Sequence, residues 1–359
     1  MSTARKNTSG VFFGSVSRKT HPTCFSVAVS LIALTVAMSG QERPGGEGFS
    51  FRTSVELINV TATVTDEQGR FVPGLTAGDF RVYEDGKLQA IQQFDNERVP
   101  VSLGIALDTS GSMIGEKMAA AEAALNRFVF DLLGDQDEMF LYRFDSRPEL
   151  VQGWTENRQA IRKALGVIRP NGGTAIYDTV AEAVPLANSG TRRKKALVII
   201  SDGNDTSSRT KADQLSGLVR RTEVIVYAIG IDASGDLHQS SRPSGPPQPV
   251  PVPSPFPGKA PLPQAPRPQR PAHSGSPQDR VNPDALRRIT DDTGGRTEVI
   301  VSPRDLDPAT ASIANELSRQ YFLGYSSSAP KDGRWHTIDV ELTRPGSHTV
   351  RARRGFVAN

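Results

Sequence analysis

The sequence predicts an α/β fold: a doubly wound, mostly parallel sheet with a small β-sandwich formed by the segments on either side of it. Between residues 99 and 320, continuous apolar runs alternate with stretches whose apolar residues recur at helical spacing. This alternation is typical of a parallel sheet covered by helices on both faces. The flanking segments 54–97 and 321–356 instead show strand patterns and turn signals, with no helix-length apolar stripe.

The expected elements follow from these patterns in chain order. In the first flanking segment, apolar residues alternate along 55–64, and Asp85-Gly86 predicts a hairpin turn. Neither flanking segment buries much apolar surface alone, so we expect the two to pair across the sequence. Within the central region the expected strands are 101–108, 138–144, 195–202, 223–231 and 297–301. The expected helices are 116–133, 157–168, 175–188, 211–220, 283–292 and 305–320.

A proline-rich insertion, predicted to be disordered, interrupts this alternation at residues 238–281. Residues 241–280 hold 14 of the chain's 26 prolines and almost no large apolar residues. Such a segment cannot build a core and is expected to be extended. Because it follows the strand 223–231, it leaves from the carboxyl edge of the sheet. Two interpretations stay open: an inert loop, and a tether or docking arm beside a site at that edge.

The first 39 residues are typical of a secretory signal peptide. A basic stretch precedes a 14-residue apolar run, Phe25–Met38, which is short for a membrane span, and small residues near Gly40 allow cleavage. We therefore expect an exported protein, periplasmic or extracellular, without a membrane span after cleavage. An uncleaved N-terminal anchor is the alternative. The one cysteine, Cys24, lies in this leader, so the mature chain would contain no disulfide.

The charge of the chain does not predict nucleic-acid binding. The leader contributes four of the 42 basic residues and no acidic ones, which leaves 38 basic residues against 39 acidic ones. The net charge of +3 and the pI near 9.0 therefore owe much to the leader. A nucleic-acid-binding domain would instead carry a basic stripe on its folded part.

Oxygen-bearing side chains lie on three loops at the predicted carboxyl edge of the sheet. Asp108, Ser110 and Ser112 follow the first strand, Thr174 lies in "NGGTAIYD", and Asp202 ends "ALVIISD". Ligands of doubly wound sheets bind outside the carboxyl ends of the strands. Two carboxylates and three hydroxyls form an all-oxygen set of the kind that Mg²⁺ or Mn²⁺ prefers. The hydroxyls add no charge, so a bound metal would stay electrophilic toward an incoming carboxylate.

These five positions resemble the metal-ion-dependent adhesion site (MIDAS) of the von Willebrand factor type A (VWA) domain, also called integrin I-like. That site combines Asp-x-Ser-x-Ser, a Thr on a second loop and an Asp on a third, and "DTSGS" at 108–112, Thr174 and Asp202 match in order. The resemblance covers 99–320, and the flanking "DFRVYEDGKLQAI" and "QYFLGY" resemble a bacterial exported subgroup. It implies that Ser110 and Ser112 are direct ligands and that a partner's carboxylate fills the open position. Asp108, Thr174 and Asp202 would bind directly or through water.

Other acidic residues near these loops have simpler explanations. Asp178 lies in the first turn of a predicted helix, where the helix dipole favours a negative charge. Asn204 and Asp205 are typical of a turn.

An enzymatic function is not predicted. The serines lack the Gly-x-Ser-x-Gly elbow, and none of the five histidines is placed beside them as a base. The chain also lacks a His/Cys cluster at zinc-ligand spacing and a phosphate-binding loop.

The sequence therefore predicts an exported binding or adhesion module that captures an acidic group of a protein partner through Mg²⁺ or Mn²⁺. The alternative is a metal-independent scaffold or assembly factor for cell-envelope proteins.

Overall fold

The computed structural model describes residues 56–232 and 281–358. The predicted signal peptide (1–39) and all but the last residue of the predicted insertion (238–281) lie outside these ranges. The domain boundaries drawn from the sequence therefore remain a prediction.

The centre of the described region is a six-stranded sheet with the order β10-β9-β8-β5-β6-β7. Five strands are parallel, and β7 pairs antiparallel with β6 at one edge. The strands are β5 (Val101–Asp108), β6 (Glu138–Phe144), β7 (Pro148–Thr155), β8 (Lys194–Ser201), β9 (Ile225–Ile231) and β10 (Thr297–Ile300). All residues of β5 and β9 are buried, as expected for continuous apolar strands covered on both faces. The predicted doubly wound, mostly parallel sheet is confirmed.

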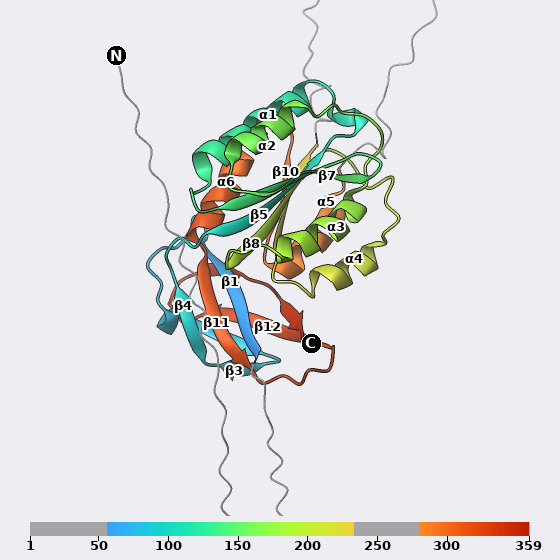
Figure 1. Cartoon of the computed structure of the whole chain (residues 1–359). Coiled ribbons are helices and arrows are strands. Elements are labelled where there is room, and N and C mark those ends of the chain that lie inside the picture. The colour runs from blue at the N-terminus through green and yellow to red at the C-terminus, as the bar shows by residue number, and fades with distance from the viewer. Residues whose placement is uncertain (1–55, 233–280, 359) are drawn as a thin grey trace, which may run out of the picture. The chain divides into compact units, whose positions relative to one another are not determined.

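Helices cover both faces of this sheet, as Figure 1 shows. One hydrophobic cluster joins the sheet to α1, α2 and α6, and a second joins the other face to α3, α4 and α5. The helices are α1 (Glu116–Arg127), α2 (Arg158–Gly166), α3 (Ile176–Asn188), α4 (Ala212–Val219), α5 (Pro283–Thr290) and α6 (Leu306–Arg319). Short 3₁₀ turns are η1 (Ala77–Asp79), η2 (Gly111–Met113), η6 (Asp291–Thr293) and η7 (Pro303–Asp305). None of the helices in the described ranges has the length and apolarity that a bilayer span requires.

The expected helix 116–133 changes from α-helical to π-helical hydrogen bonding near its end. The α-helix ends at Arg127 and continues as a π-helical turn, η3 (Phe128–Leu132), in which the N–H of Leu133 donates to the carbonyl of Phe128. The wider turn lets Phe128, Val129 and Leu133 all remain buried in the core beside the sheet.

The flanking segments form two four-stranded sheets, with orders β13-β1-β11-β4 and β14-β12-β2-β3. Each sheet combines strands from both ends of the chain: β1 pairs with β11, and β2 pairs with β12. This confirms the predicted sandwich made by N- and C-terminal segments. Its strands are β1 (Glu56–Asp66), β2 (Phe80–Glu84), β3 (Lys87–Gln89), β4 (Ile91–Asp95), β11 (Tyr321–Ser327), β12 (Trp335–Leu342), β13 (His348–Arg351) and β14 (Gly355–Val357).

Tyr321 organises the core of the sandwich. Its ring packs against Phe71, Phe80 and Phe94 at centroid distances of 5.4, 5.3 and 6.0 Å. Its hydroxyl donates to the Val72 carbonyl at 2.7 Å, so the one polar atom of this buried ring is satisfied. Strands from both ends of the chain thus share one aromatic cluster.

A polar network ties α6 to the sandwich where the helix runs into β11. Oε1 of Glu316 accepts hydrogen bonds from Thr63 at 3.1 Å and from Tyr227 at 2.9 Å, and it also pairs with Arg351. Nε2 of Gln320 donates to the same two hydroxyls, at 3.0 and 2.9 Å. Because these residues come from β1, β9, β13 and the helix end, the network joins the sandwich to the central sheet.

The β2–β3 hairpin carries an ion pair that depends on pH. Asp85 and Gly86 both have positive φ, 49° and 75°, as a type I′ turn requires. Nδ1 of His336 lies 2.7 Å from Oδ2 of Asp85, and Nε2 lies 3.4 Å from Oδ1 of Asp332. The hydrogen bond to Asp85 raises the pKa of His336 above its ordinary 6.5, against the opposing effect of burial.

We expect His336→Gln to destabilise the protein more at pH 6 than at pH 8.5. A raised folded-state pKa contributes stability that is fully present below the unfolded pKa and is lost as the pH rises through the folded pKa. The effect should be at most about 1 kcal/mol at pH 6. Urea unfolding at both pH values measures it. His348→Gln is the matched control, because neither ring nitrogen of His348 has a hydrogen-bond partner in the described region. An equal loss at both pH values for His336→Gln would contradict this assignment.

Candidate functional site

The first loop of the candidate site begins where β5 ends, at the fully buried Asp108. One carboxylate oxygen accepts the backbone N–H of Ser110 at 2.8 Å, which folds the chain back at the strand end. The other accepts the hydroxyl of Ser201 at 2.5 Å, from the last position of the neighbouring strand β8. The carboxylate is therefore held rigidly between two parallel strands.

A chain of oxygen atoms leads from this loop to the third loop. Oγ of Ser110 lies 3.0 Å from Oγ of Ser112, and Ser112 in turn donates to Oδ1 of Asp202 at 2.8 Å. Ser110 and Asp202 are 2% and 1% exposed, whereas Ser112 between them is exposed, so this chain of oxygen atoms is open to solvent at Ser112. The structure thus brings together four of the five predicted residues through direct hydrogen bonds.

The second loop is fastened to the first by backbone hydrogen bonds. The N–H of Gly111 donates to the carbonyl of Gly172 at 3.0 Å, and the N–H of Asn171 donates to the carbonyl of Thr109 at 2.7 Å. The buried Thr174 follows, and a Cβ added to Gly203 would lie 3.5 Å from its Oγ1. The Thr174 hydroxyl therefore faces the backbone next to Asp202, and all three loops converge.

Two glycines permit this convergence. Gly172 has a φ of +80°, and a Cβ there would lie 2.9 Å from Oγ of Ser146. A Cβ on Gly173 would lie 2.5 Å from Oγ of Ser207. A side chain at either position would require a neighbouring serine side chain to shift, and a non-glycine residue at 172 would also be strained by the positive φ.

Electrostatics at the site favour a bound cation. Burial and, to a smaller extent, the charge of Asp202 raise the pKa of Asp108 to about 7, although hydrogen bonds from Ser201 and Ser110 oppose this. Two buried carboxylates close together are costly unless a positive charge compensates them. An ammonium already lies there: Nζ of Lys117 bonds Oδ2 of Asp202.

The donor set fits a hard divalent cation. It offers two carboxylates and three hydroxyls, all oxygen, which suits Mg²⁺ or Mn²⁺ with water completing the shell. Residues 56–232 and 281–358, this site included, contain no group of three or more His, Cys, Asp or Glu side chains that could hold a metal ion. A metal here would depend on hydroxyl ligands.

Residues 103–204 match the family model of the von Willebrand factor type A domain. Over this range the chain is similar to VWA domains. The match includes all five candidate residues. VWA domains are protein-interaction modules that are generally not enzymes, and they often bind a divalent metal at a MIDAS.

Individual relatives cover only parts of the chain. Human inter-alpha-trypsin inhibitor heavy chain H4 is 28% identical in an alignment of 153 residues, which covers 38% of this chain and 16% of that protein. A solved VWA structure from Catenulispora acidiphila is 15% identical, covering 85% of this chain and 75% of the other with a TM-score of 0.46. Proximal thread matrix protein 1 from the mussel byssus, solved with a zinc-occupied MIDAS, is 14% identical, covering 66% of this chain and 50% of the other with a TM-score of 0.46.

Two acidic residues outside the set of five brace the third loop of the site. Asp178, in the first turn of α3, accepts the backbone N–H of Arg209 at 3.0 Å and of Thr210 at 2.8 Å. Asp205 accepts the hydroxyl of Ser208 at 2.6 Å, which is the turn role expected from the sequence, and it also accepts the N–H of Tyr177 on α3 at 2.8 Å. The helix dipole alone does not explain Asp178, because its carboxylate reaches a loop that is distant in sequence.

Two functional candidates were missed by sequence reasoning. Ser201 interrupts an apolar strand one residue before Asp202, and that polar residue in a buried run was an available signal. Lys117 lies on α1 among residues of ordinary helical spacing, and nothing in the pattern indicates that its side chain turns toward Asp202. Only the packing of α1 beside the loops reveals this contact.

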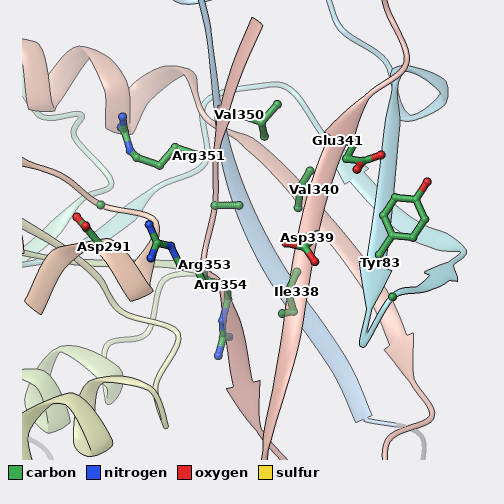
Figure 2. Close-up of a pocket in the computed structure, with 13 residues that line it drawn as sticks. Tyr83, Asp291, Ile338, Asp339, Val340, Glu341, Val350, Arg351, Arg353 and Arg354 are labelled. Carbon is green, nitrogen blue, oxygen red and sulfur yellow. The ribbon is translucent and has the colours of Figure 1, made fainter. Parts of the chain in front are cut away.

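A second hollow lies away from these loops. A cleft of about 560 Å³ is formed by sandwich strands and the turn before β10. Figure 2 shows Asp339 and Glu341 on β12 at one side, and Arg351, Arg353 and Arg354 at the other. Because both signs of charge line it, the cleft indicates no ligand class, and we retain the loops at the strand ends as the candidate site.

The bracing role of Asp178 can be tested with Asp178→Asn. The hydrogen bonds from Thr210 and Arg209 outweigh burial and lower the pKa of Asp178 from 3.8. The carboxylate therefore stabilises the fold above that pH, and its contribution is lost only as the pH falls through the folded pKa. At pH 7 the variant should lose about 1–2 kcal/mol of unfolding free energy and the amides of the third loop should exchange faster.

Asp213→Asn is the matched control. Asp213 is an exposed acid in the first turn of α4, and it should change stability by less than about 0.5 kcal/mol. Equal stability and loop exchange in wild type and Asp178→Asn would exclude the bracing role.

Proposed function

We propose that this chain is an exported binding or adhesion module whose VWA domain captures an acidic group of a protein partner through Mg²⁺ or Mn²⁺. Asp108, Ser110, Ser112, Thr174 and Asp202 would hold the metal. The observation that carries this proposal is the line of oxygen atoms from Ser110 through Ser112 to Asp202, which joins two loops at the carboxyl edge of the sheet.

The five residues would contribute charged and neutral oxygen ligands. Asp108 and Asp202 would supply the negative charge that retains the cation, and Ser110, Ser112 and Thr174 would supply neutral oxygens. When bound, the metal would supply the electrophilic contact for the partner's carboxylate. Ser201 and the backbone N–H of Ser110 would hold Asp108 in place, as they do in the structure.

The surface around the loops supports a protein partner. Ile114 follows the first loop directly and is 67% exposed, so it offers an apolar side chain to a partner beside the loops. A cleft of about 540 Å³ adjoins the third loop, lined by Tyr177, Asn204, Asp205, Thr206, Asn282 and Ala285. An apolar contact and a hollow beside a cation site together suit a partner that presents a carboxylate on a shaped surface.

The export part of this proposal rests on the leader sequence. The competing function is a metal-independent scaffold or assembly factor for envelope proteins. That alternative draws on the network around Glu316, which joins the sandwich to the VWA domain without any contribution from the five residues. The two functions differ in their dependence on metal.

Calorimetric titration with Mg²⁺ and Mn²⁺ tests the site. The wild-type chain should bind one ion saturably, and Asp202→Asn should weaken binding by at least about a hundredfold because it removes one of two charged ligands. Asp213→Asn removes an exposed carboxylate from the same domain and should bind as wild type does. Circular dichroism in EDTA establishes that each variant is folded.

Absence of metal binding by a folded wild-type chain would sink the metal-dependent function and advance the scaffold. If metal binds, partners captured from envelope extract should be lost both in EDTA and with Asp108→Ala. Partners that persist under both conditions would also favour the scaffold.

A further inference from the structure

Lys117 on α1 makes a contact with the candidate metal site that the five-residue pattern does not include. Its Nζ bonds Oδ2 of Asp202, while Oδ1 of the same carboxylate accepts the hydroxyl of Ser112. The Asp202 side chain is fully buried, and the Lys117 side chain is 23% exposed. Both oxygens of Asp202 are therefore engaged, one by a residue of the first loop and one by a cation.

The position of Lys117 is not what the helix itself favours. α1 begins at Glu116, after Gly115 with a φ of +90°, so Lys117 is its second residue. The N-terminal turn of a helix carries partial positive charge and favours acidic over basic side chains. The position of the ammonium at this helix end is thus best explained by its attraction to Asp202. Lys117 can reach Asp202 because it follows Ser112, which also bonds Asp202, by only five residues.

The ion pair also uses the negative charge of Asp202, which a bound metal would need. Asp108 and Asp202 are 0% and 1% exposed, and their charges disfavour one another. An ammonium on one oxygen of Asp202 relieves that repulsion. A divalent cation among the same oxygens would meet a positive charge already in contact with one of its ligands.

We propose that Lys117 is a tethered competitor for the metal, which neutralises Asp202 in the metal-free protein and must leave it when a divalent cation binds. This inference rests on the proposed function. It makes Lys117 a residue that sets the threshold concentration of metal. The metal-free site is stabilised by its own lysine, and only a cation that binds more strongly than the ammonium displaces it.

Metal titration of Lys117→Gln and Lys117→Arg tests the competition. Lys117→Gln should bind Mn²⁺ about tenfold more tightly than wild type, which corresponds to about 1.4 kcal/mol. Lys117→Arg keeps the charge and should stay near the wild-type affinity. Lys163→Gln removes one positive charge from an exposed position on α2, so it controls for the general attraction of the domain for cations.

Thermal unfolding in EDTA supplies a second readout that needs no metal. Lys117→Gln should lower the melting temperature in wild type but have little effect in an Asp202→Asn background, because the pair is then already broken. An equal loss in both backgrounds would overturn the pairing.

The outcomes separate this inference from the proposed function. Wild-type metal binding with unchanged or weaker affinity in Lys117→Gln would overturn the competition alone. Absence of metal binding in both proteins would overturn the proposed function and the competition with it. Tighter binding in Lys117→Gln, with Lys163→Gln unchanged, supports both.

Discussion

The structure depends on one electrostatic constraint: two buried aspartates at the carboxyl ends of adjacent parallel strands need a nearby positive charge. β5 and β8 are neighbours in the sheet, so Asp108 and Asp202, at or just past their ends, are brought together by topology. The apolar packing on both faces of the sheet excludes water from the strand ends, and this raises the cost of two negative charges. The Ser112 hydroxyl and the Lys117 ammonium compensate part of that cost.

The rest of the α/β domain keeps this arrangement rigid. The second loop is tied to the first by backbone hydrogen bonds, with Gly172 in the positive-φ conformation that favours glycine, and the third loop is braced from α3 by Asp178. Where α6 runs into β11, the network around Glu316 joins this helix to strands from both ends of the chain. Under the proposed function, this rigidity would let the site select its cation by geometry, because its oxygens have little freedom to rearrange.

Much of this was predictable because it depends on periodicity and on topology. The alternation of apolar strands and helices predicts the doubly wound sheet, and the sheet predicts that loops after 108 and 201 meet at one edge. The pairing of 54–97 with 321–356 followed from the small apolar surface of each. What the sequence could not predict depends on side-chain direction. The turn of Lys117 toward Asp202, the reach of Asp178 across to Thr210 and the π turn after Arg127 each follow from packing between elements distant in sequence.

The most direct measurement is a crystal structure of the chain grown with Mn²⁺, with anomalous scattering recorded at the manganese edge. The account predicts one strong anomalous peak bounded by the Ser110 and Ser112 hydroxyls, with the Lys117 ammonium withdrawn from Asp202. Ordered loops without a peak, or a peak beside other residues, would contradict it.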